Sequence, residues 1–259
     1  MVEEYTVERI LEHSAKSQVC IVKRINKENL CEESLYVYKR TMYSRNLNEV
    51  ICPRIIKHES VINIIDYEIT EIDENNIILH ILYEYVDGVD LYYKFEHIDV
   101  SERTIQVYVR EMAKCIKQCH DNNVVHLDIK PENFIVKSEN PLKLVLIDFG
   151  FSEVLETSTG ELFSRKTGTE HYCAPEIHRR LFSKKSDVYS LGVICYMLFT
   201  NSLLIDSDWR YGIESSIKKP TALFIDFLRD CLVVSIHDRQ DIDQVLHHPW
   251  LLFTHSYPF

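Results

Sequence analysis

Apolar residues follow two different periodicities along the chain. Residues 19–23, 35–40 and 77–85 are rich in β-branched and aromatic side chains, a composition that is typical of strands. Between the second and third of these segments, residues 44–57 favour a helix, although Pro53 removes one backbone hydrogen bond from it. These patterns predict a small part, built mainly of strands, at the start of the chain.

From residue 101 onward the periodicity becomes helical. Ser101 is a suitable N-cap, and Glu102 falls in the first turn, where the helix dipole favours an acid. The apolar face of this helix recurs at three- and four-residue steps, at Ile105, Tyr108, Met112, Cys115 and Cys119. A larger helical part therefore follows the strands, and the two parts join near residues 84–89.

Composition narrows the classes of partner. The 259 residues are 46% hydrophobic and 27% charged, which suits a folded protein with one large domain or two small lobes. The formal net charge of −11 argues against nucleic acid or an anionic membrane surface and favours cationic peptides. The longest strongly apolar run, residues 191–199, is too short to span a bilayer and predicts a buried helix.

The eight cysteines include no Cys-x-x-Cys pair, and the chain begins with the acidic run Met-Val-Glu-Glu-Tyr rather than with a secretory signal. We therefore expect reduced thiols in an intracellular protein, with cytoplasm and nucleus both open.

The segment 125–133, Val-His-Leu-Asp-Ile-Lys-Pro-Glu-Asn, concentrates groups that suit phosphoryl transfer. Asp128 can accept a proton from an attacking hydroxyl, and Lys130 can neutralise charge on a transferring phosphoryl group. Asn133, and Asp148 fifteen residues later, offer oxygen ligands of the kind that Mg²⁺ prefers. Positioning and electrostatics supply most of the catalysis in such reactions, so this spacing predicts a phosphotransferase.

Three motifs resemble those of eukaryotic serine/threonine protein kinases: residues 126–133, Asp-Phe-Gly at 148–150, and Ala-Pro-Glu at 174–176. The catalytic segment and the His-Pro-Trp that ends at Trp250 look closest to the calcium/calmodulin-kinase-like and Aurora-like branches. The resemblance covers nearly the whole chain. It implies ATP and Mg²⁺ as cofactors and, through the Aurora-like branch, a cell-cycle role.

The same resemblance implies an α+β, bilobal protein-kinase fold within a single domain, residues 1–259. A small antiparallel-sheet N-lobe with one helix would occupy about residues 1–83. A hinge at 84–89 would connect it to a larger, mainly helical C-lobe at 90–259, with nucleotide bound in the cleft between the lobes.

For the nucleotide, the resemblance implies that Lys39 contacts the phosphates and pairs with Glu49. Leu11 and Val19 would flank the adenine.

At the hinge, backbone groups of Glu84 and Val86 would hydrogen-bond the adenine. Tyr83 would guard the deeper pocket, and Asp90 lies where the family often has an acid that contacts ribose or substrate.

Two departures from the family affect nucleotide binding. Glu12, Ser14 and Ser17 stand where three glycines normally let backbone amides approach the phosphates, so we expect weakened ATP affinity. An ordinary hairpin without a phosphate role is the alternative. Pro53, one helical turn after Glu49, either fixes the helix in one pose or loosens the Lys39–Glu49 pair.

A third departure affects regulation. Leu127 replaces the arginine that, in the family, pairs with a phosphorylated residue of the activation segment, here residues 148–176. The residue that accepts the phosphate in the family often stands four residues before the equivalent of Thr169, and here that position is Arg165. The arginine that would bind the phosphate and the residue that would carry it are therefore both missing. This predicts an enzyme that is not controlled by this phosphorylation, with Ser164 as a weaker candidate acceptor.

Other residues carry over from the family as supports. Thr169 would hydrogen-bond Asp128 and Lys130, which points to serine and threonine as acceptors. Glu176 would form a buried ion pair with Arg239.

Asp187 would brace the catalytic loop. Glu132 and Asp90 would favour arginine three residues before the acceptor, and Met197 leaves little preference two residues before it.

The leading hypothesis is an active ATP-dependent serine/threonine protein kinase that acts on protein substrates, with a regulatory protein as a further candidate partner. A pseudokinase scaffold is the alternative, favoured by the missing glycines and by Pro53. A small-molecule kinase is a third reading, disfavoured by residues 167–176, which resemble a peptide-docking segment.

Overall fold

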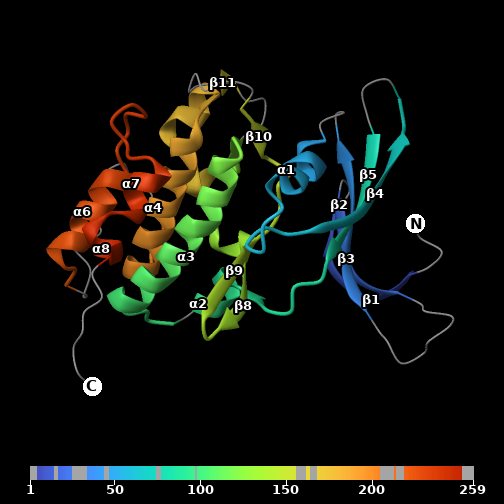
Figure 1. The fold of residues 1–259 in the computed structure, drawn as a ribbon, viewed down its shortest axis with the longest axis horizontal. Helices are drawn as coiled ribbons and strands as arrows, with labels where there is room; N and C mark the ends of the chain where they lie inside the picture. Colours follow the sequence, from blue (N-terminus) through green and yellow to red (C-terminus); the bar gives the residue numbers. More distant parts are fainter. Residues whose placement is uncertain are drawn as a thin grey trace.

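A computed structural model of the chain describes residues 5–14, 17–24, 34–43, 47–73, 77–96, 98–155, 162–163, 168–204, 213 and 219–252. Figure 1 shows a sheet with one helix beside it on the right, and a larger group of helices on the left. The α+β class and the order of the two parts are therefore as the sequence predicts.

The first sheet has five antiparallel strands in the order β1-β2-β3-β5-β4. The three strands expected from composition are present, and two more lie at the edges of the sheet. Both of these edge strands are largely exposed, so their apolar residues do not form a buried face. The five strands are β1 (Tyr5–His13), β2 (Ser17–Arg24), β3 (Leu35–Tyr43), β4 (Ile64–Glu71) and β5 (Ile77–Glu84).

The helix beside this sheet, α1 (Asn48–Ile56), is shorter than the predicted 44–57. Leu47 occupies its N-cap without a side-chain hydrogen bond, and residues 44–46 lie outside the described residues. At the other end, Lys57 adopts a left-handed conformation, which ends the helix. Pro53 lies inside α1 and is buried.

The helical part is centred on α3 (Glu102–Asp121) and α4 (Lys184–Thr200), which pack against each other. Ser101 caps α3, accepting from the Thr104 N–H at 3.1 Å, and the predicted apolar face of α3 is buried. The other helices are α2 (Leu91–Phe95), α6 (Ala222–Cys231), α7 (Ile242–Leu246) and α8 (Pro249–Leu252).

Short elements connect these helices and shape the region between the two parts. The short helical turns are η2 (Pro131–Asn133), η3 (Glu170–Tyr172) and η4 (Pro175–Arg179). The short strands are β6 (Val89–Asp90), β7 (Val124–Val125), β8 (Phe134–Glu139), β9 (Leu142–Leu146), β10 (Glu153–Val154), β11 (Leu162–Phe163) and β12 (Leu181–Phe182).

One hydrophobic core runs through both parts, from Val50 of α1 and Ile81 of β5 to the helices. At the far end of the helical part, the indole of Trp250 contacts the ring of Phe224 edge-to-face and the ring of Phe227 at a tilt, and it donates to Glu102 at 2.9 Å. The apolar run 191–199, which is too short to span a bilayer, lies inside α4 and is largely buried, as predicted.

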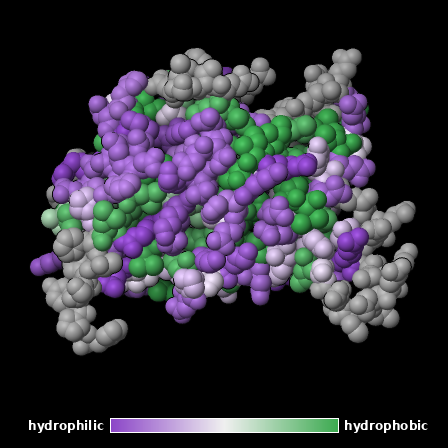
Figure 2. All heavy atoms as spheres, in the orientation of Figure 1, coloured by the Kyte–Doolittle hydropathy of each residue, from purple (hydrophilic) through white to green (hydrophobic). Residues whose placement is uncertain are grey.

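Hydrophilic residues cover most of the helical part in the view of Figure 2, and apolar residues gather over the sheet part on the right. Among the described residues, no helix is long and apolar enough to cross a membrane. The seven described cysteines are free thiols, and six of them are buried; Cys31 lies outside the described residues.

A buried ion pair ties the segment before α4 to the end of the chain. Arg239, which is 1% exposed, donates to both carboxylate oxygens of Glu176, at 2.7 and 2.9 Å. The guanidinium also donates to the carbonyl of Val233 and lies over the ring of Tyr189. The predicted pair is therefore confirmed, and it is desolvated on both sides.

Replacing Arg239 with methionine leaves the Glu176 carboxylate buried without its partner. We expect Arg239→Met to lower the free energy of unfolding by about 3–5 kcal/mol, measured by urea denaturation. Arg229→Ala is the matched control, because it breaks an exposed pair with Asp226 and should cost less than about 1 kcal/mol. Equal losses in the two variants would contradict this account.

Candidate active site

The Asp128 carboxylate is buried at the centre of the catalytic segment and is surrounded by hydrogen-bond donors. One of its oxygens, Oδ1, accepts from the Thr169 N–H at 2.9 Å and from the Thr169 hydroxyl at 2.7 Å. The other, Oδ2, lies 2.9 Å from the Lys130 ammonium and 3.1 Å from the Asn133 amide nitrogen. Lys130 also donates to the Thr169 hydroxyl, so the expected link between Thr169 and both residues is present.

These donors set the charge of Asp128. Burial by itself raises the pKa of this carboxyl. Hydrogen bonds and charge from Lys130, with the two hydrogen bonds from Thr169, outweigh burial and hold the pKa below its ordinary value. The carboxylate is therefore ionised at neutral pH.

Close approach of Thr169 depends on the glycine before it. A Cβ at Gly168 would lie 2.1 Å from the Leu127 carbonyl oxygen, so any side chain there would push the backbone around Thr169 away from the catalytic segment.

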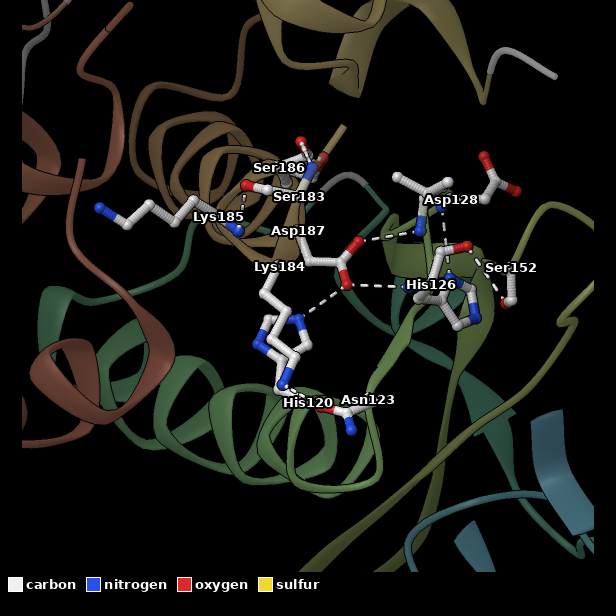
Figure 3. Close-up of polar contacts among 12 residues, drawn as sticks. His120, Asn123, His126, Asp128, Ser152, Ser183, Lys184, Lys185, Ser186 and Asp187 are labelled. Carbon is white, nitrogen blue, oxygen red and sulfur yellow. Dashed lines mark hydrogen bonds and ion pairs between the residues drawn. The ribbon is translucent and has the colours of Figure 1, made fainter. Parts of the chain in front are cut away.

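Asp187 of α4 hydrogen-bonds the backbone of the catalytic segment (Figure 3). Its carboxylate, 0% exposed, accepts from the backbone N–H of His126 at 2.9 Å and of Leu127 at 2.8 Å. The His120 ring nitrogen Nε2 contacts the same carboxylate at 2.9 Å. Leu127 has a φ of 64°, a left-handed conformation in which a leucine is held only by such contacts. The predicted bracing role of Asp187 is confirmed.

A second group of charges joins the sheet part to the segment after the catalytic loop. The Lys39 ammonium lies 2.6 Å from Oε1 of Glu49 and 3.0 Å from Oδ1 of Asp148. Pro53 has therefore not separated the Lys39–Glu49 pair. Partial burial raises the pKa of the Asp148 carboxyl, but Lys39 more than offsets this, and the pKa lies below its ordinary value.

A cavity of about 900 Å³ lies between the sheet and the helical part. Its walls include every residue that the sequence assigned to nucleotide or metal: Leu11, Val19, Lys39, Glu49, Glu84, Val86, Asp90, Asn133 and Asp148. Asp128 and Lys130 do not line it, and they meet it through Asn133. Apolar walls that the sequence analysis missed come from Val37, Ile62, Ile135 and Ile147.

Ser14, after β1, and Ser17, the first residue of β2, hydrogen-bond to each other. The Ser14 N–H donates to the Ser17 carbonyl at 2.8 Å, and the Ser17 N–H donates to the Ser14 hydroxyl at 3.0 Å. Two amides at the positions of the expected glycines thus already have partners. Glu12 pairs with Val19 across the strands and lines the cavity, so it does not point away from it.

Two further acids at the cavity have distinct surroundings. Asp90 is the N-cap of α2 and accepts from the Tyr93 N–H at 2.8 Å, a structural role that the sequence analysis missed. Among the described residues, the buried oxygen Oε2 of Glu132 has no hydrogen-bond partner.

Leu127 belongs to a small apolar cluster beside the catalytic loop. The other buried members of this cluster are Val125, Leu155, Ala174, Ile177 and Phe182. Leu155 follows the Asp-Phe-Gly motif, while Ile177 follows Ala-Pro-Glu, so apolar contacts link both ends of the activation segment to the catalytic loop. Ser164, Arg165 and Thr167 lie outside the described residues.

The protein kinase domain family matches residues 6–251, and the chain belongs to this family. Calcium-dependent protein kinase 6 of Plasmodium berghei (strain Anka) is 30% identical over 241 residues, which are 86% of this chain and 16% of that protein. A probable myosin light chain kinase of Dictyostelium discoideum is 26% identical over 260 residues, 94% of this chain and 62% of that protein. The probable serine/threonine-protein kinase MARK-C of the same organism is 28% identical over 213 residues, 78% of this chain and 27% of that protein.

The chain thus spans less than two thirds of the length of these relatives. The likeness is distant and falls among calcium-dependent, myosin light chain and MARK kinases, in line with the calcium/calmodulin-kinase-like resemblance.

Proposed function

We propose that the chain is an active ATP-dependent serine/threonine protein kinase. It transfers the γ-phosphoryl group of Mg-ATP to serine and threonine hydroxyls of protein substrates. One observation carries the proposal: the ionised Asp128 carboxylate, held by Lys130, Thr169 and Asn133, stands beside a cavity that contains the Lys39–Glu49–Asp148 group.

In this reaction Asp128 orients the acceptor hydroxyl and takes its proton as the oxygen attacks the γ-phosphorus. Lys130, 2.9 Å from the same carboxylate, is placed to stabilise negative charge on the transferring group. Lys39, fixed by Glu49, holds the phosphates of the nucleotide.

Asn133 and Asp148 are the residues that would hold Mg²⁺. Both line the cavity, and the Asn133 amide nitrogen is bonded to Asp128, which leaves the amide oxygen as the ligand atom. An amide and a carboxylate oxygen suit this ion, whose other ligands would be water and phosphate oxygens. Bound there, the ion supplies electrostatic stabilisation of the phosphate charge.

For adenine, Leu11 and Val19 form the upper wall and the backbone of Glu84 and Val86 supplies the hydrogen bonds. This assignment places the N-lobe at about residues 1–83, the hinge at 84–89 and the C-lobe at 90–259, within one domain of 1–259.

The scaffold hypothesis keeps two supporting observations. The self-bonded turn at Ser14–Ser17 and the nearby Glu12 both weaken phosphate binding. The intact Lys39–Glu49 pair favours the enzyme, because a scaffold has no need for it.

Arginine three residues before the acceptor is the proposed substrate preference, with little selection two residues before it. Glu132 supports it, because this residue lines the cavity and a carboxylate there can accept from a guanidinium. Asp90 contributes charge although one of its oxygens caps α2. The related kinases give no ground for a cell-cycle role, and the proposal does not include one.

Transfer of labelled γ-phosphate to a positional peptide library tests the function directly. We expect wild-type protein to label Ser/Thr peptides with arginine at minus three, and Asp128→Asn to lower kcat by roughly 10²- to 10⁴-fold. A folded wild type that transfers nothing at millimolar ATP would overturn the proposal in favour of the scaffold. Proline-directed or acid-directed labelling would overturn only the arginine preference.

Neutralising Glu12 should improve nucleotide binding. Removing a negative charge beside the phosphates should tighten ATP by about threefold to tenfold in Glu12→Gln, with adenosine affinity unchanged. Calorimetry at low and high salt measures this, and the gain should shrink at high salt. Glu8→Gln on the same strand is the control, since Glu8 is exposed and does not line the cavity. An equal gain for adenosine would contradict the electrostatic explanation.

The apolar cluster around Leu127 predicts activity without phosphorylation of the activation segment. We expect phosphatase-treated protein, verified by mass spectrometry, to keep the kcat of untreated protein. A kcat that collapses on dephosphorylation and returns on rephosphorylation would show that a phosphate is needed after all.

A further inference from the structure

Tyr83 reaches from the sheet into the ion-pair group that holds the phosphate-binding lysine. It lies near the end of β5, between Val37 of β3 and Ile64 of β4. Its hydroxyl donates to Oε1 of Glu49 at 2.9 Å, and the Lys39 ammonium lies 2.6 Å from the same oxygen. A neutral donor and a cation therefore converge on one carboxylate oxygen at the inner wall of the cavity.

The helix that carries Glu49 is weak in its own hydrogen bonding. It has nine residues, and Leu47 gives it no side-chain cap. Pro53 has no N–H to donate to the carbonyl four residues earlier, which is that of Glu49 itself. A helix this short is stabilised mainly by tertiary contacts, so the position of Glu49 depends on what surrounds it.

Neighbouring segments hold the first turn of α1 in place. The Asn48 amide donates to the Ser152 carbonyl at 3.0 Å and to Glu153 at 2.8 Å, which fixes the start of α1 against the segment after Asp-Phe-Gly. Tyr83 holds the next residue, Glu49. Because Glu49 is only 1% exposed, its negative charge must be stabilised by hydrogen-bond donors and cations within the protein.

We propose that Tyr83 is a positioning residue for phosphate binding: its hydroxyl fixes Glu49, and through Glu49 it fixes Lys39. The proposal rests on the proposed kinase function and adds a residue to it. Lys39 has two carboxylates within reach, Glu49 and Asp148. With Glu49 fixed, the ammonium stays in the cavity between them, where the phosphates bind.

The alternative is that Tyr83 only fills space, since its ring is buried beside the cavity. Phenylalanine separates the two roles, because it keeps the ring and removes only the hydroxyl. Tyr38→Phe is the matched control: Tyr38 lies on the neighbouring strand and its hydroxyl bonds His80, away from the cavity.

The test compares ADP and adenosine affinities by calorimetry, together with kcat and urea unfolding, in wild type, Tyr83→Phe and Tyr38→Phe. A hydrogen bond to a charged group is worth roughly tenfold or more, so Tyr83→Phe should weaken ADP by about tenfold and lower kcat by a similar factor. Adenosine affinity should stay at the wild-type value in both variants, and Tyr38→Phe should bind ADP as wild type does. A pure filling role predicts no change in the ratio of ADP to adenosine affinity, and that result would overturn the proposal.

A double-mutant cycle then asks whether Tyr83 acts through Glu49. In a Glu49→Gln background, Tyr83→Phe should have a much smaller effect on ADP affinity than in wild type. Additive effects would overturn the proposed route through Glu49. The binding ratio does not depend on turnover, so a wild type that binds ADP but transfers nothing would end the kinase function while still deciding the role of Tyr83.

Discussion

The site depends on one buried carboxylate, that of Asp187, which fixes the backbone of the catalytic segment by hydrogen bonds. It is fully buried and accepts from two consecutive backbone amides and a histidine ring. A buried charge must be matched by donors, so the segment cannot follow another path without leaving this carboxylate uncompensated. The left-handed Leu127 conformation follows from this constraint, and the next residue, Asp128, is thereby aimed at Thr169 and Lys130.

From this point, electrostatics connects the two parts of the molecule. Asp128 and Asp148 are both held ionised by lysines, Lys130 and Lys39, although burial alone would favour their neutral forms. Each lysine is in turn fixed by a second partner, Thr169 for one and Glu49 for the other. Two carboxylates and two cations are thus held in defined positions: Lys39 and Asp148 in the wall of the cavity, and Asp128 and Lys130 next to it, with Asp128 bonded to Asn133. Fixed charges of this kind are the preorganisation that the proposed phosphoryl transfer requires.

Most of this arrangement follows from local spacing, which is why the sequence predicts it. The catalytic segment and its partner Asp148 belong to motifs whose spacing can be counted, whereas the pair Glu176–Arg239 was predicted only from the resemblance to the family. Contacts outside a motif escape such counting: Tyr83 and Glu49 are 34 positions apart, and nothing in either segment indicates their hydrogen bond. The edge strands β1 and β4 were missed for another reason, since exposed strands need no apolar alternation.

Three features of this chain act in one physical direction. The turn at Ser14–Ser17 bonds its own amides, the cluster around Leu127 replaces an arginine–phosphate contact with apolar packing, and Tyr83 adds a hydrogen bond to Glu49. Glycines and phosphate-dependent ion pairs allow a segment to change its conformation, whereas packed apolar groups and buried hydrogen bonds favour one conformation. We infer that this chain holds the residues proposed to bind phosphate in place through fixed contacts, and that the mutually bonded Ser14 and Ser17 lower its affinity for the nucleotide.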